Sequence, residues 1–377
     1  MSKQAKKGCV PVLRFPEFRE AGEWEEKTLE DVAPLQRGFD LPSDQIKLGT
    51  IPVVYSNGVQ NFNNKGMAKA PGVVTGRSGT IGKIHFIEDG DYWPHNTSLW
   101  VTSFKGNHPK FIYFLYISIG ISQFASGSGV PTLNRNYVHA FKTRIPPILK
   151  EQQKIATCLS SLDELITAQS QKLDALKTHK KGLMQQLFPA EGETVPQLRF
   201  PEFREAGEWK IKQFDKLFTI GNGRDYKHLS SGDIPVYGSG GYMLSVDNYL
   251  YDGESVCIGR KGTINNPMFL TGKFWTVDTL FYTHSFKDCL PKFIYLIFQN
   301  INWLKHNEAG GVPSLSKTNI GKIEVAIPET DEQQKIADCL SSLDELITAQ
   351  AQKIEALKTH KKGLMQQLFP VVNEVEA

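Results

Sequence analysis

The sequence lacks the features that mark membrane proteins, secreted disulfide-bonded proteins and zinc proteins. None of its apolar runs approaches the ~18–20 residues that a membrane-spanning helix needs. The N-terminus, MSKQAKKGCV, is basic but has no apolar signal-peptide core. The five cysteines are scattered, odd in number and without a CxxC pair. These absences predict a cytoplasmic protein with reduced thiols and no zinc site.

The sequence also lacks the motifs of nucleotide-binding and methyl-transfer enzymes. GRSGTIGK (76–83) is similar to a phosphate-binding loop, but one residue too many separates Gly76 from Gly82, and Ile84 follows the lysine. No GxGxxG follows a strand, and no Asn/Asp-Pro-Pro-aromatic motif of amino-methyltransferases is present. No His/Cys or carboxylate cluster recurs in both halves. We therefore predict no catalytic, cofactor-binding or metal-binding residue in this chain.

What the chain does contain is a long internal repeat. VPVLRFPEFREAGEW (10–24) returns as VPQLRFPEFREAGEW (195–209) with one substitution, and residues 151–189 return at 332–370 with four. The segments between these near-identical blocks have diverged much further. Because the second half ends where a copy of 10–24 would follow, we expect a pseudo-two-fold assembly with the two ends of the chain close together.

The longer repeated block predicts a helix with a coiled-coil seam. Apolar residues recur in it at 4-3-4-3 spacing, without an internal proline, and Pro189 and Pro370 follow the last seam residues. At 1.5 Å per residue each helix is ~55 Å long. Two helices related by a two-fold axis run antiparallel, so Gln169 and Gln350 should meet near that axis. The alternative is two surface helices, each packed on its own domain. The predicted seam comprises Ile155, Leu159, Leu162, Ile166, Gln169, Leu173 and Leu176, with Ile336, Leu340, Leu343, Ile347, Gln350, Ile354 and Leu357.

The divergent segments share a skeleton of short motifs. GRSGTI (76–81) matches GRKGTI (259–264), and HPKFIYFLY (108–116) matches LPKFIYLIF (290–298). Runs such as Ser98–Phe104 and Phe274–Thr283 predict strands, and the PKFIY stretches predict short amphipathic helices. The predicted fold class is α+β, with two mixed α/β, mostly β domains separated by two long antiparallel coiled-coil helices.

We divide the chain at the ends of the repeated blocks. The predicted parts are an N-terminal segment 1–24, a first variable domain 25–149, a helix 150–188, a linker 189–209 that repeats the N-terminal segment, a second variable domain 210–330, a second helix 331–370 and a tail 371–377.

This organisation resembles the specificity subunit of type I restriction–modification systems. The resemblance rests on the duplicated LRFPEFREAGEW, GRxGTI, GVP and EQQKIA…LDELI…LFP stretches, which occur in the same order in both halves. It implies that the variable domains are target-recognition domains, each reading one half of an asymmetric, split DNA sequence. It also implies that the helices set the spacer and dock two modification (methyltransferase) subunits. S-adenosylmethionine, ATP and Mg would bind partner subunits, including the restriction subunits that translocate and cleave DNA, and this chain would be non-catalytic.

Comparison of the two domains separates candidate DNA contacts into two groups. Residues that are the same in both domains are candidates for contacts to phosphate or for a structural role. Residues that differ at matching positions are candidates for reading bases. A phosphate contact and a structural salt bridge both remain open for Arg77 and Arg260. The remaining candidates could equally be solvated loop residues or turn formers. They are Asn57, Gln60, Asn61, Lys65, His95, Asn96, Asn134 and Arg135 in the first domain, and Arg224, Tyr226, Lys227, Ser239, Tyr242, Lys261, Asp278, Ser316 and Lys317 in the second.

Two other functions stay open on the residues alone. A self-sufficient methyltransferase or nuclease would bind S-adenosylmethionine or cleave DNA without partners. A structural adaptor would use only its coiled coil, and its variable domains would show no preference among DNA sequences. The net charge of +3 permits a nucleic-acid partner without demanding one.

Overall fold

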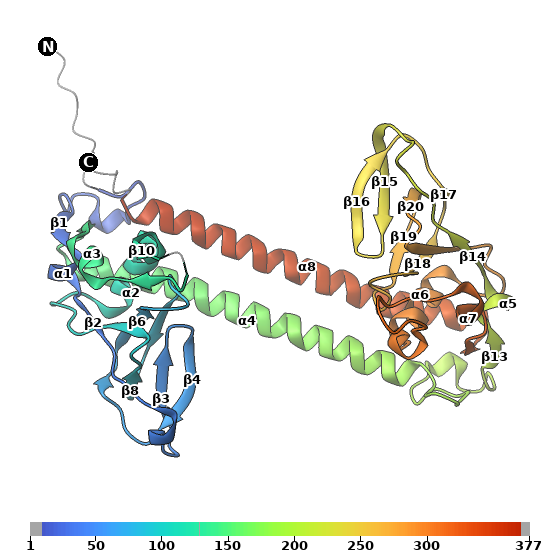
Figure 1. The fold of residues 1–377 in the computed structure, drawn as a ribbon, viewed down its shortest axis with the longest axis horizontal. Coiled ribbons are helices and arrows are strands. Elements are labelled where there is room, and N and C mark those ends of the chain that lie inside the picture. Colours follow the sequence, from blue (N-terminus) through green and yellow to red (C-terminus); the bar gives the residue numbers. More distant parts are fainter. Residues whose placement is uncertain (1–9, 128, 371–377) are drawn as a thin grey trace, which may run out of the picture. The chain divides into compact units, whose positions relative to one another are not determined.

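The computed structural model describes residues 10–127 and 129–370, so that the predicted tail and the start of the N-terminal segment lie outside it. The chain forms two compact units, Met1–Ser170 with Gln352–Ala377 and Gln171–Ala351. The two long helices are α4 (Leu149–Leu187) and α8 (Thr330–Leu368) (Figure 1). Each of them is divided between the two units. Each unit is therefore a β-rich domain with pieces of both helices.

The two ends of the described chain meet in the first unit. The Leu13 amide donates to the Gln367 carbonyl at 2.9 Å, next to the end of α8. In the second unit the repeated segment makes the matching bond, from the Leu198 amide to the Gln186 carbonyl at 2.9 Å near the end of α4. The expectation that the chain closes on itself is confirmed by this pair of bonds.

The first unit contains two four-stranded sheets and two short strand pairs. One sheet has the order β2-β9-β6-β7 and the other β4-β3-β8-β5, with β3 and β8 parallel. In the described part of this unit, three short α-helices and three 3-10 helices (Pro16–Phe18, Ser43–Gln45 and Ile121–Phe124) complete the domain. The strands are β1 (Glu25–Thr28), β2 (Leu35–Arg37), β3 (Ile51–Tyr55), β4 (Gly58–Asn63), β5 (Ala68–Lys69), β6 (Gly72–Gly76), β7 (Ile84–Ile87), β8 (Asp91–Pro94), β9 (Ser98–Val101), β10 (Ala125–Ser126), β11 (Thr132–Leu133) and β12 (Lys142–Ile145); the helices are α1 (Leu29–Val32), α2 (Pro109–Ile119) and α3 (Arg135–Ala140).

The second unit repeats this topology despite its divergent sequence. Its sheets have the orders β14-β21-β18-β19 and β16-β15-β20-β17, and β15 and β20 are parallel, as are β3 and β8 in the first unit. Its elements are β13 (Lys210–Gln213), α5 (Phe214–Leu217), β14 (Thr219–Asn222), β15 (Ser231–Gly238), β16 (Gly241–Val246), β17 (Tyr251–Asp252), β18 (Ser255–Gly259), β19 (Met268–Leu270), β20 (Lys273–Thr276), β21 (Leu280–His284), α6 (Pro291–Asn300), α7 (Lys317–Gly321) and β22 (Glu324–Ile327).

The local predictions hold with two refinements. Both PKFIY stretches form helices, α2 and α6, each with proline in its first turn, where the missing amide costs no hydrogen bond. The strand expected over Ser98–Phe104 ends at Val101. The run expected as one strand over Phe274–Thr283 is two, β20 and β21, with a turn between them. That turn belongs to the candidate site described below.

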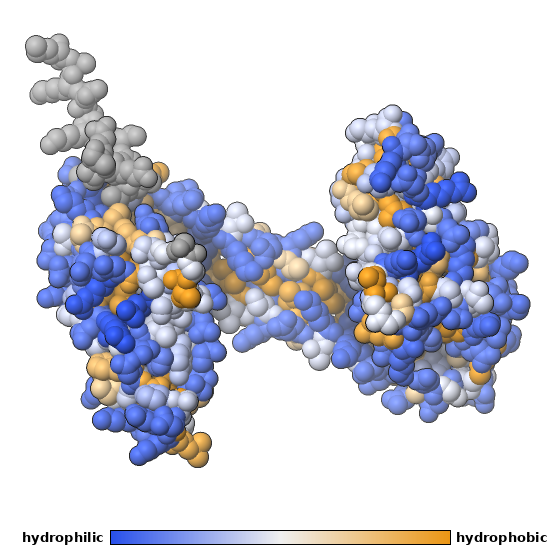
Figure 2. Space-filling model, in the orientation of Figure 1, coloured by the Kyte–Doolittle hydropathy of each residue, from blue (hydrophilic) through white to orange (hydrophobic). Residues whose placement is uncertain are grey.

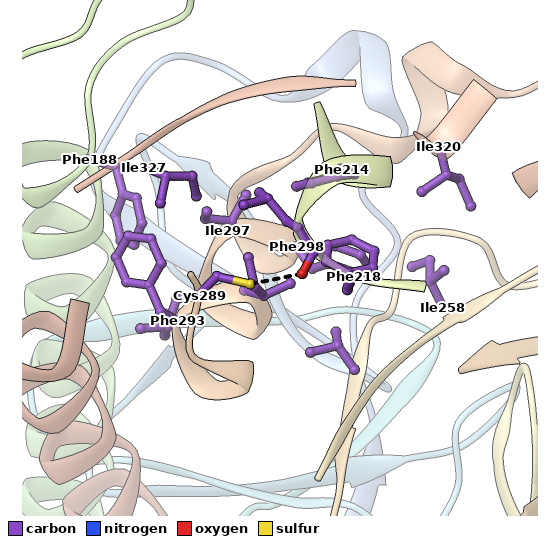
Figure 3. Packing of buried hydrophobic residues seen from close by; sticks show 14 of the residues in the cluster. Phe188, Phe214, Phe218, Ile258, Cys289, Phe293, Ile297, Phe298, Ile320 and Ile327 are labelled. Atoms are coloured by element: carbon purple, nitrogen blue, oxygen red, sulfur yellow. Dashed lines mark hydrogen bonds between the residues drawn. The ribbon is translucent and has the colours of Figure 1, made fainter. Parts of the chain in front are cut away.

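Aromatic rings fix the helix ends in the domains. In the first unit Phe369 packs edge-on against Trp24 at 6.4 Å and lies 5.6 Å from Phe111 between ring centroids. In the second unit Phe188 stacks on Phe293 at 5.3 Å, inside a cluster that also holds Ile327 (Figure 3). The LFP motif at the end of each repeat therefore places a phenylalanine in a domain core.

Two buried ion pairs tie the repeated N-terminal segments to the helix starts. Arg14 donates through Nε and Nη2 to Glu151, both at 2.8 Å, and Arg199 donates likewise to Glu332 at 2.7 Å. The two glutamate side chains are 1% and 2% exposed. This two-pronged geometry matches the planar guanidinium to both carboxylate oxygens, which is why arginine and not lysine suits the position.

The helices α4 and α8 pack together within each unit. In the second unit the Lys180 ammonium donates to both Asp344 oxygens at 2.7 Å, and in the first unit Lys361 pairs with Asp163. These lysines occupy positions of the 4-3-4-3 pattern, and their side chains are only 12% and 16% exposed. A charged residue is tolerated on such a face because its partner lies on the facing helix.

The reactivity of the cysteines depends on how deeply each thiol is buried in the domain cores. The four cysteines in the described part of the chain form no disulfide with one another. Burial raises the pKa of Cys257 to about 12 and that of Cys289 to about 11, and Cys289 also donates to the Leu217 carbonyl (Figure 3). Because the thiolate is the nucleophile, both should resist iodoacetamide at pH 8.

Mass-spectrometric peptide mapping would measure this reactivity. We expect Cys257 and Cys289 to be modified at least tenfold more slowly in the native protein than in urea, because a pKa near 11 leaves little thiolate at pH 8. Cys158 and Cys339, which are half-buried on the helices, serve as internal controls that should react faster. Equal rates at all four native sites would contradict the packing described here.

Candidate nucleic-acid interface

Each domain has a glycine loop at the end of a central, fully buried strand. The loop follows β6 in the first unit and β18 in the second. A Cβ atom on Gly76 would lie 1.8 Å from the Thr80 carbonyl oxygen, and one on Gly259 would lie 2.0 Å from that of Thr263. Both contacts are shorter than any real side chain allows, so the first glycine of each GRxGTI motif is required by close backbone approach.

Two further loops bond to the glycine loop of the first unit. The amides of Arg77 and Ser78 donate to the Thr97 carbonyl at 2.8 and 3.2 Å. The Leu133 amide donates to the Arg77 carbonyl at 2.7 Å, and Ser78 forms an isolated β-bridge with Thr132. Residues 76–82, 95–97 and 131–135 thus form one assembly.

The turn of the β3–β4 hairpin completes this assembly. A Cβ on Gly79 would be 3.7 Å from the Ser56 hydroxyl, which places the turn directly beside the glycine loop. In the second unit the corresponding distance, from Gly262 to the Ser239 hydroxyl, is 3.3 Å. We call the four segments the loop cluster: 55–58, 76–82, 95–97 and 131–135 in the first unit, and 238–241, 259–264, 277–279 and 313–317 in the second.

The structure gathers most of the first domain's predicted residues in its loop cluster. Asn57, Arg77, His95, Asn96, Asn134 and Arg135 belong to it, whereas Gln60 and Asn61 lie along β4 and Lys65 follows that strand.

His95 and Asn96 are held by specific neighbours. The His95 ring lies 4.1 Å from the Tyr55 ring between centroids, and its Nδ1 is 3.0 Å from the Thr97 hydroxyl. Burial lowers the pKa of His95, which keeps the imidazole neutral at pH 7. The Asn96 amide donates to Asp40. The turn after β8 therefore presents neutral hydrogen-bonding groups.

The second domain's predicted residues surround an open cleft of about 720 Å³. Tyr226, Lys227, Ser239, Tyr242 and Asp278 line it. Tyr242 is 62% exposed, so its ring and hydroxyl are available to a ligand. Asp225 lines the cleft as well, so that a cation, two carboxylates and two phenols supply donors and acceptors of the kind that read base edges.

The other predicted residues of the second domain border this region. The Arg224 carbonyl accepts from the Trp275 indole at 2.8 Å, and the Arg224 amide donates to the Thr276 carbonyl at 2.8 Å. The Arg260 guanidinium lies 3.4 Å from the Asp278 carbonyl. Lys261 forms an isolated bridge with Ser314, one residue before the GVPSL motif ends.

Cations of the predicted set are left without carboxylate partners. Within residues 10–127 and 129–370, no ion pair within 4 Å joins a carboxylate to any of Lys65, Arg77, Arg135, Arg224, Lys227, Arg260, Lys261 and Lys317. The structural-salt-bridge alternative for Arg77 and Arg260 therefore has no partner among the described residues. Burial and the neighbouring Arg260 charge lower the pKa of Lys317. Cations held together this way suit a polyanion such as DNA.

Two predicted residues have a structural role in addition. The Asn134 side chain accepts from the Asn136 amide at 3.0 Å at the start of α3, and the Ser316 hydroxyl accepts from the Asn319 amide at 3.2 Å at the start of α7. They occupy equivalent positions, and both are helix N-caps. Their oxygen atoms are therefore engaged in the fold.

The sequence comparison missed residues that the structure brings into the loop cluster or against it. These are Asp40, Tyr55, Ser56 and Ser78. Ser56 could have been found, because it aligns with Ser239 when GTIPVVYSNG (49–58) is matched to GDIPVYGSGG (232–241). Nothing in the sequence signals the contact between Asp40 and Asn96, which are far apart in the chain.

Neither a metal cluster nor a membrane span is found in the described residues. No group of three His, Cys, Asp or Glu side chains there is arranged to hold a metal ion. None of the helices in the described ranges is both long and apolar enough to cross a bilayer.

The helices form the second candidate surface. Every residue of the predicted seam is buried or half-buried, whereas Leu165 and Leu346, which occupy equivalent positions in the two repeats, are 39% and 55% exposed. Figure 2 shows apolar atoms among hydrophilic ones along the helices. Gln169 lies in the first unit and Gln350 in the second, so their meeting stays a prediction.

Duplicated β-rich domains with unpaired cations in matching loops define a protein that recognises nucleic acid. Both repeats, over residues 21–178 and 206–359, match the model of the type I restriction modification DNA specificity domain. The chain belongs to this family and carries its DNA specificity domain twice.

Individual relatives are distant in sequence. The type I restriction enzyme MjaVIII specificity subunit of Methanocaldococcus jannaschii is 23% identical over 289 residues, covering 64% of each protein. A second protein of that organism, the type I restriction enzyme MjaX specificity subunit, is 23% identical over 273 residues, which cover 63% of this chain and 60% of that protein. The chain thus spans about three fifths of the length of these curated relatives.

Solved structures share the fold over nearly the whole chain. The S subunit of a type I restriction–modification system from M. genitalium has a TM-score of 0.68 at 16% identity, with 97% of this chain and 100% of that chain covered. A chain from a study of complex assembly and conformational transition of the type I R-M system has a TM-score of 0.56 at 12% identity, covering 92% and 97%. At 16% and 12% sequence identity, these comparisons show that the fold is shared.

Proposed function

We propose that each domain reads one half-site of an asymmetric, bipartite DNA target. The observation that carries this proposal is the repetition of one loop cluster, with unpaired cations, in two domains whose loop residues differ. A shared frame provides equivalent contacts to the DNA backbone, and differing side chains provide different base preferences. Because the protein is one chain and its two domains differ in sequence, the two half-sites should differ and the target should not be a palindrome.

The helices set the spacer between the half-sites under this proposal. Half-sites read from one face of the duplex lie about one turn apart, roughly 34–36 Å centre to centre. Helices α4 and α8 each have 39 residues, which corresponds to about 58 Å at 1.5 Å per residue. Helices of this length are sufficient for that separation.

The helices also dock two modification subunits in this proposal. Equivalent partners require equivalent surfaces, and the repeated helices keep the exposed Leu165 and Leu346 at matching positions while the domains have diverged. Methyl transfer with S-adenosylmethionine, and ATP- and Mg-dependent translocation and cleavage, then belong to the modification and restriction subunits. The chain itself contributes binding and geometry and no catalytic residue.

Substitutions in the domains and in the helices should give different phenotypes. Asn57→Ala and Lys261→Ala should each reduce methylation about tenfold or more through one half-site, since a good base contact contributes ~1–3 kcal/mol of discrimination. Leu173→Asp should instead impair assembly, because it puts a charge at a half-buried position of α4. Methylome sequencing of cells with the modification partner measures the first effect, and co-purification of subunits measures the second.

The division of roles has a clear contrary result. If Leu173→Asp left assembly intact and changed the methylated sequence, the helices would take part in reading DNA. Lys177→Ala is a control on the same helix, since its side chain is exposed and lies outside the seam, and the substitution should change neither assembly nor the methylated sequence.

A further inference from the structure

The two loop clusters hold one tripeptide in the same backbone frame. In the first unit the amides of Arg77, Ser78 and Gly79 donate to Thr97, Thr97 and Pro131 at 2.8, 3.2 and 3.2 Å. The frame uses only backbone groups, so it does not depend on which side chain stands at its middle position.

The second unit reproduces each of these bonds. The amides of Arg260, Lys261 and Gly262 donate to Thr279, Thr279 and Pro313 at 2.8, 3.3 and 2.9 Å. Ser78 forms an isolated antiparallel bridge with Thr132, as Lys261 does with Ser314. The Cα atoms of Ser78 and Lys261 therefore occupy equivalent places in their own domains.

The side chains in this frame divide into a constant and a variable position. The first residue is arginine in both domains, and neither arginine has a carboxylate within 4 Å among the described residues. The second residue is a half-buried serine in the first domain and an exposed lysine in the second. A cation that is the same in both domains suits a contact to phosphate, because phosphate carries no sequence information. A side chain that differs between the domains suits a contact to a base.

We propose that Ser78 is a specificity-determining residue of the first domain, reading a base from the position that Lys261 occupies in the second. This proposal rests on the proposed function, because it needs each domain to read its own half-site. Lysine only donates, and in the major groove its partners are guanine O6 and N7. Serine donates and accepts, so its base preference is weaker.

Reciprocal exchange of the two side chains tests the proposal. The full-length chain, purified with its co-expressed modification subunits, would select from a library of randomised duplex DNA, and the bound fraction would be sequenced. We expect Ser78→Lys to create a preference for guanine of about tenfold or more at one base pair of the first half-site, with the second half-site unchanged. Lys261→Ser should relax a guanine preference at one base pair of the second half-site, and Lys261→Arg should keep it.

Lys261→Ser introduces a smaller side chain at an exposed position, so this variant keeps the proposal testable if Ser78→Lys fails to fold. The proposal is overturned if both exchanged variants bind every sequence more weakly or more strongly by one factor, because that behaviour marks a phosphate contact. It is also overturned if both variants select the wild-type sequence. A wild-type chain that selects no sequence at all would instead refute the proposed function.

Discussion

Glu151→Ala should lower the free energy of unfolding of the first unit by about 3–5 kcal/mol, because it leaves Arg14 buried without a counter-charge. The Glu151 carboxylate also accepts from the Trp24 indole at 3.1 Å, so the substitution removes three hydrogen bonds. A charge left unpaired at a site this enclosed costs far more than a surface pair contributes.

The repeat supplies an internal comparison for this prediction. Glu332→Ala breaks the equivalent pair with Arg199 in the second unit, but there the Trp209 indole makes no hydrogen bond that the substitution could remove. We therefore expect Glu332→Ala to cost less than Glu151→Ala by about one hydrogen bond, ~1 kcal/mol.

Hydrogen exchange resolved by peptide measures the opening of each unit separately, which a single melting curve of a two-unit chain does not. Glu202→Ala is the control, because its partner Lys335 is half exposed and the pair should contribute nothing measurable. If Glu151→Ala and Glu332→Ala showed the same protection from hydrogen exchange as Glu202→Ala, the ion pairs would not hold the N-terminal segments to the helices.

Phe369→Ala should detach the end of α8 from the first domain. The ring is 5% exposed and packs against Trp24 and Phe111, so its removal leaves a cavity and should cost ~3–5 kcal/mol. Phe188→Ala should have the same effect on α4 in the second unit, where Phe188 contacts Trp209 and Phe293.

The measurement is again peptide-resolved hydrogen exchange, combined with selection from randomised duplex DNA. Phe369→Ala should loosen the first unit and reduce discrimination at the first half-site, and Phe188→Ala should do so at the second. Leu165→Ala removes a 39% exposed side chain and should change neither. Loss of both half-sites with Phe369→Ala would contradict the view that each aromatic cluster anchors only its own domain.

The repeated parts of the chain were predictable because their signals are local. The 4-3-4-3 spacing predicted helices that the structure places at Leu149–Leu187 and Thr330–Leu368. PKFIY predicted α2 and α6, since proline at the first turn and an apolar face are properties of consecutive residues. Comparison of GRSGTI with GRKGTI correctly singled out loops that occur in both domains.

The composition of the loop cluster was only partly predictable. Gln60 and Lys65 were grouped with Asn57 by their nearness in sequence, yet β4 leads them away from the turn. Asn61 also lies on β4, but its side-chain amide donates to the Tyr55 hydroxyl of the loop cluster at 3.1 Å. Ser78 was passed over because serine in a glycine loop has no distinctive chemistry, and its importance emerges from bonds to Thr97. Pairing of Lys180 with Asp344 was likewise invisible along the chain.

Two halves with like helices and unlike domains, and the resemblance to a known family, could be recognised from the order of residues alone. Periodicity and internal repetition are recorded in the order of residues, so no coordinates are needed to read them. The meeting of four loops that lie about 13 to 34 residues apart in the chain, and the common backbone frame of Ser78 and Lys261, are properties of the folded domains. That convergence depends on which strands are neighbours in the two sheets, and strand order follows from long-range packing that a single sequence does not display.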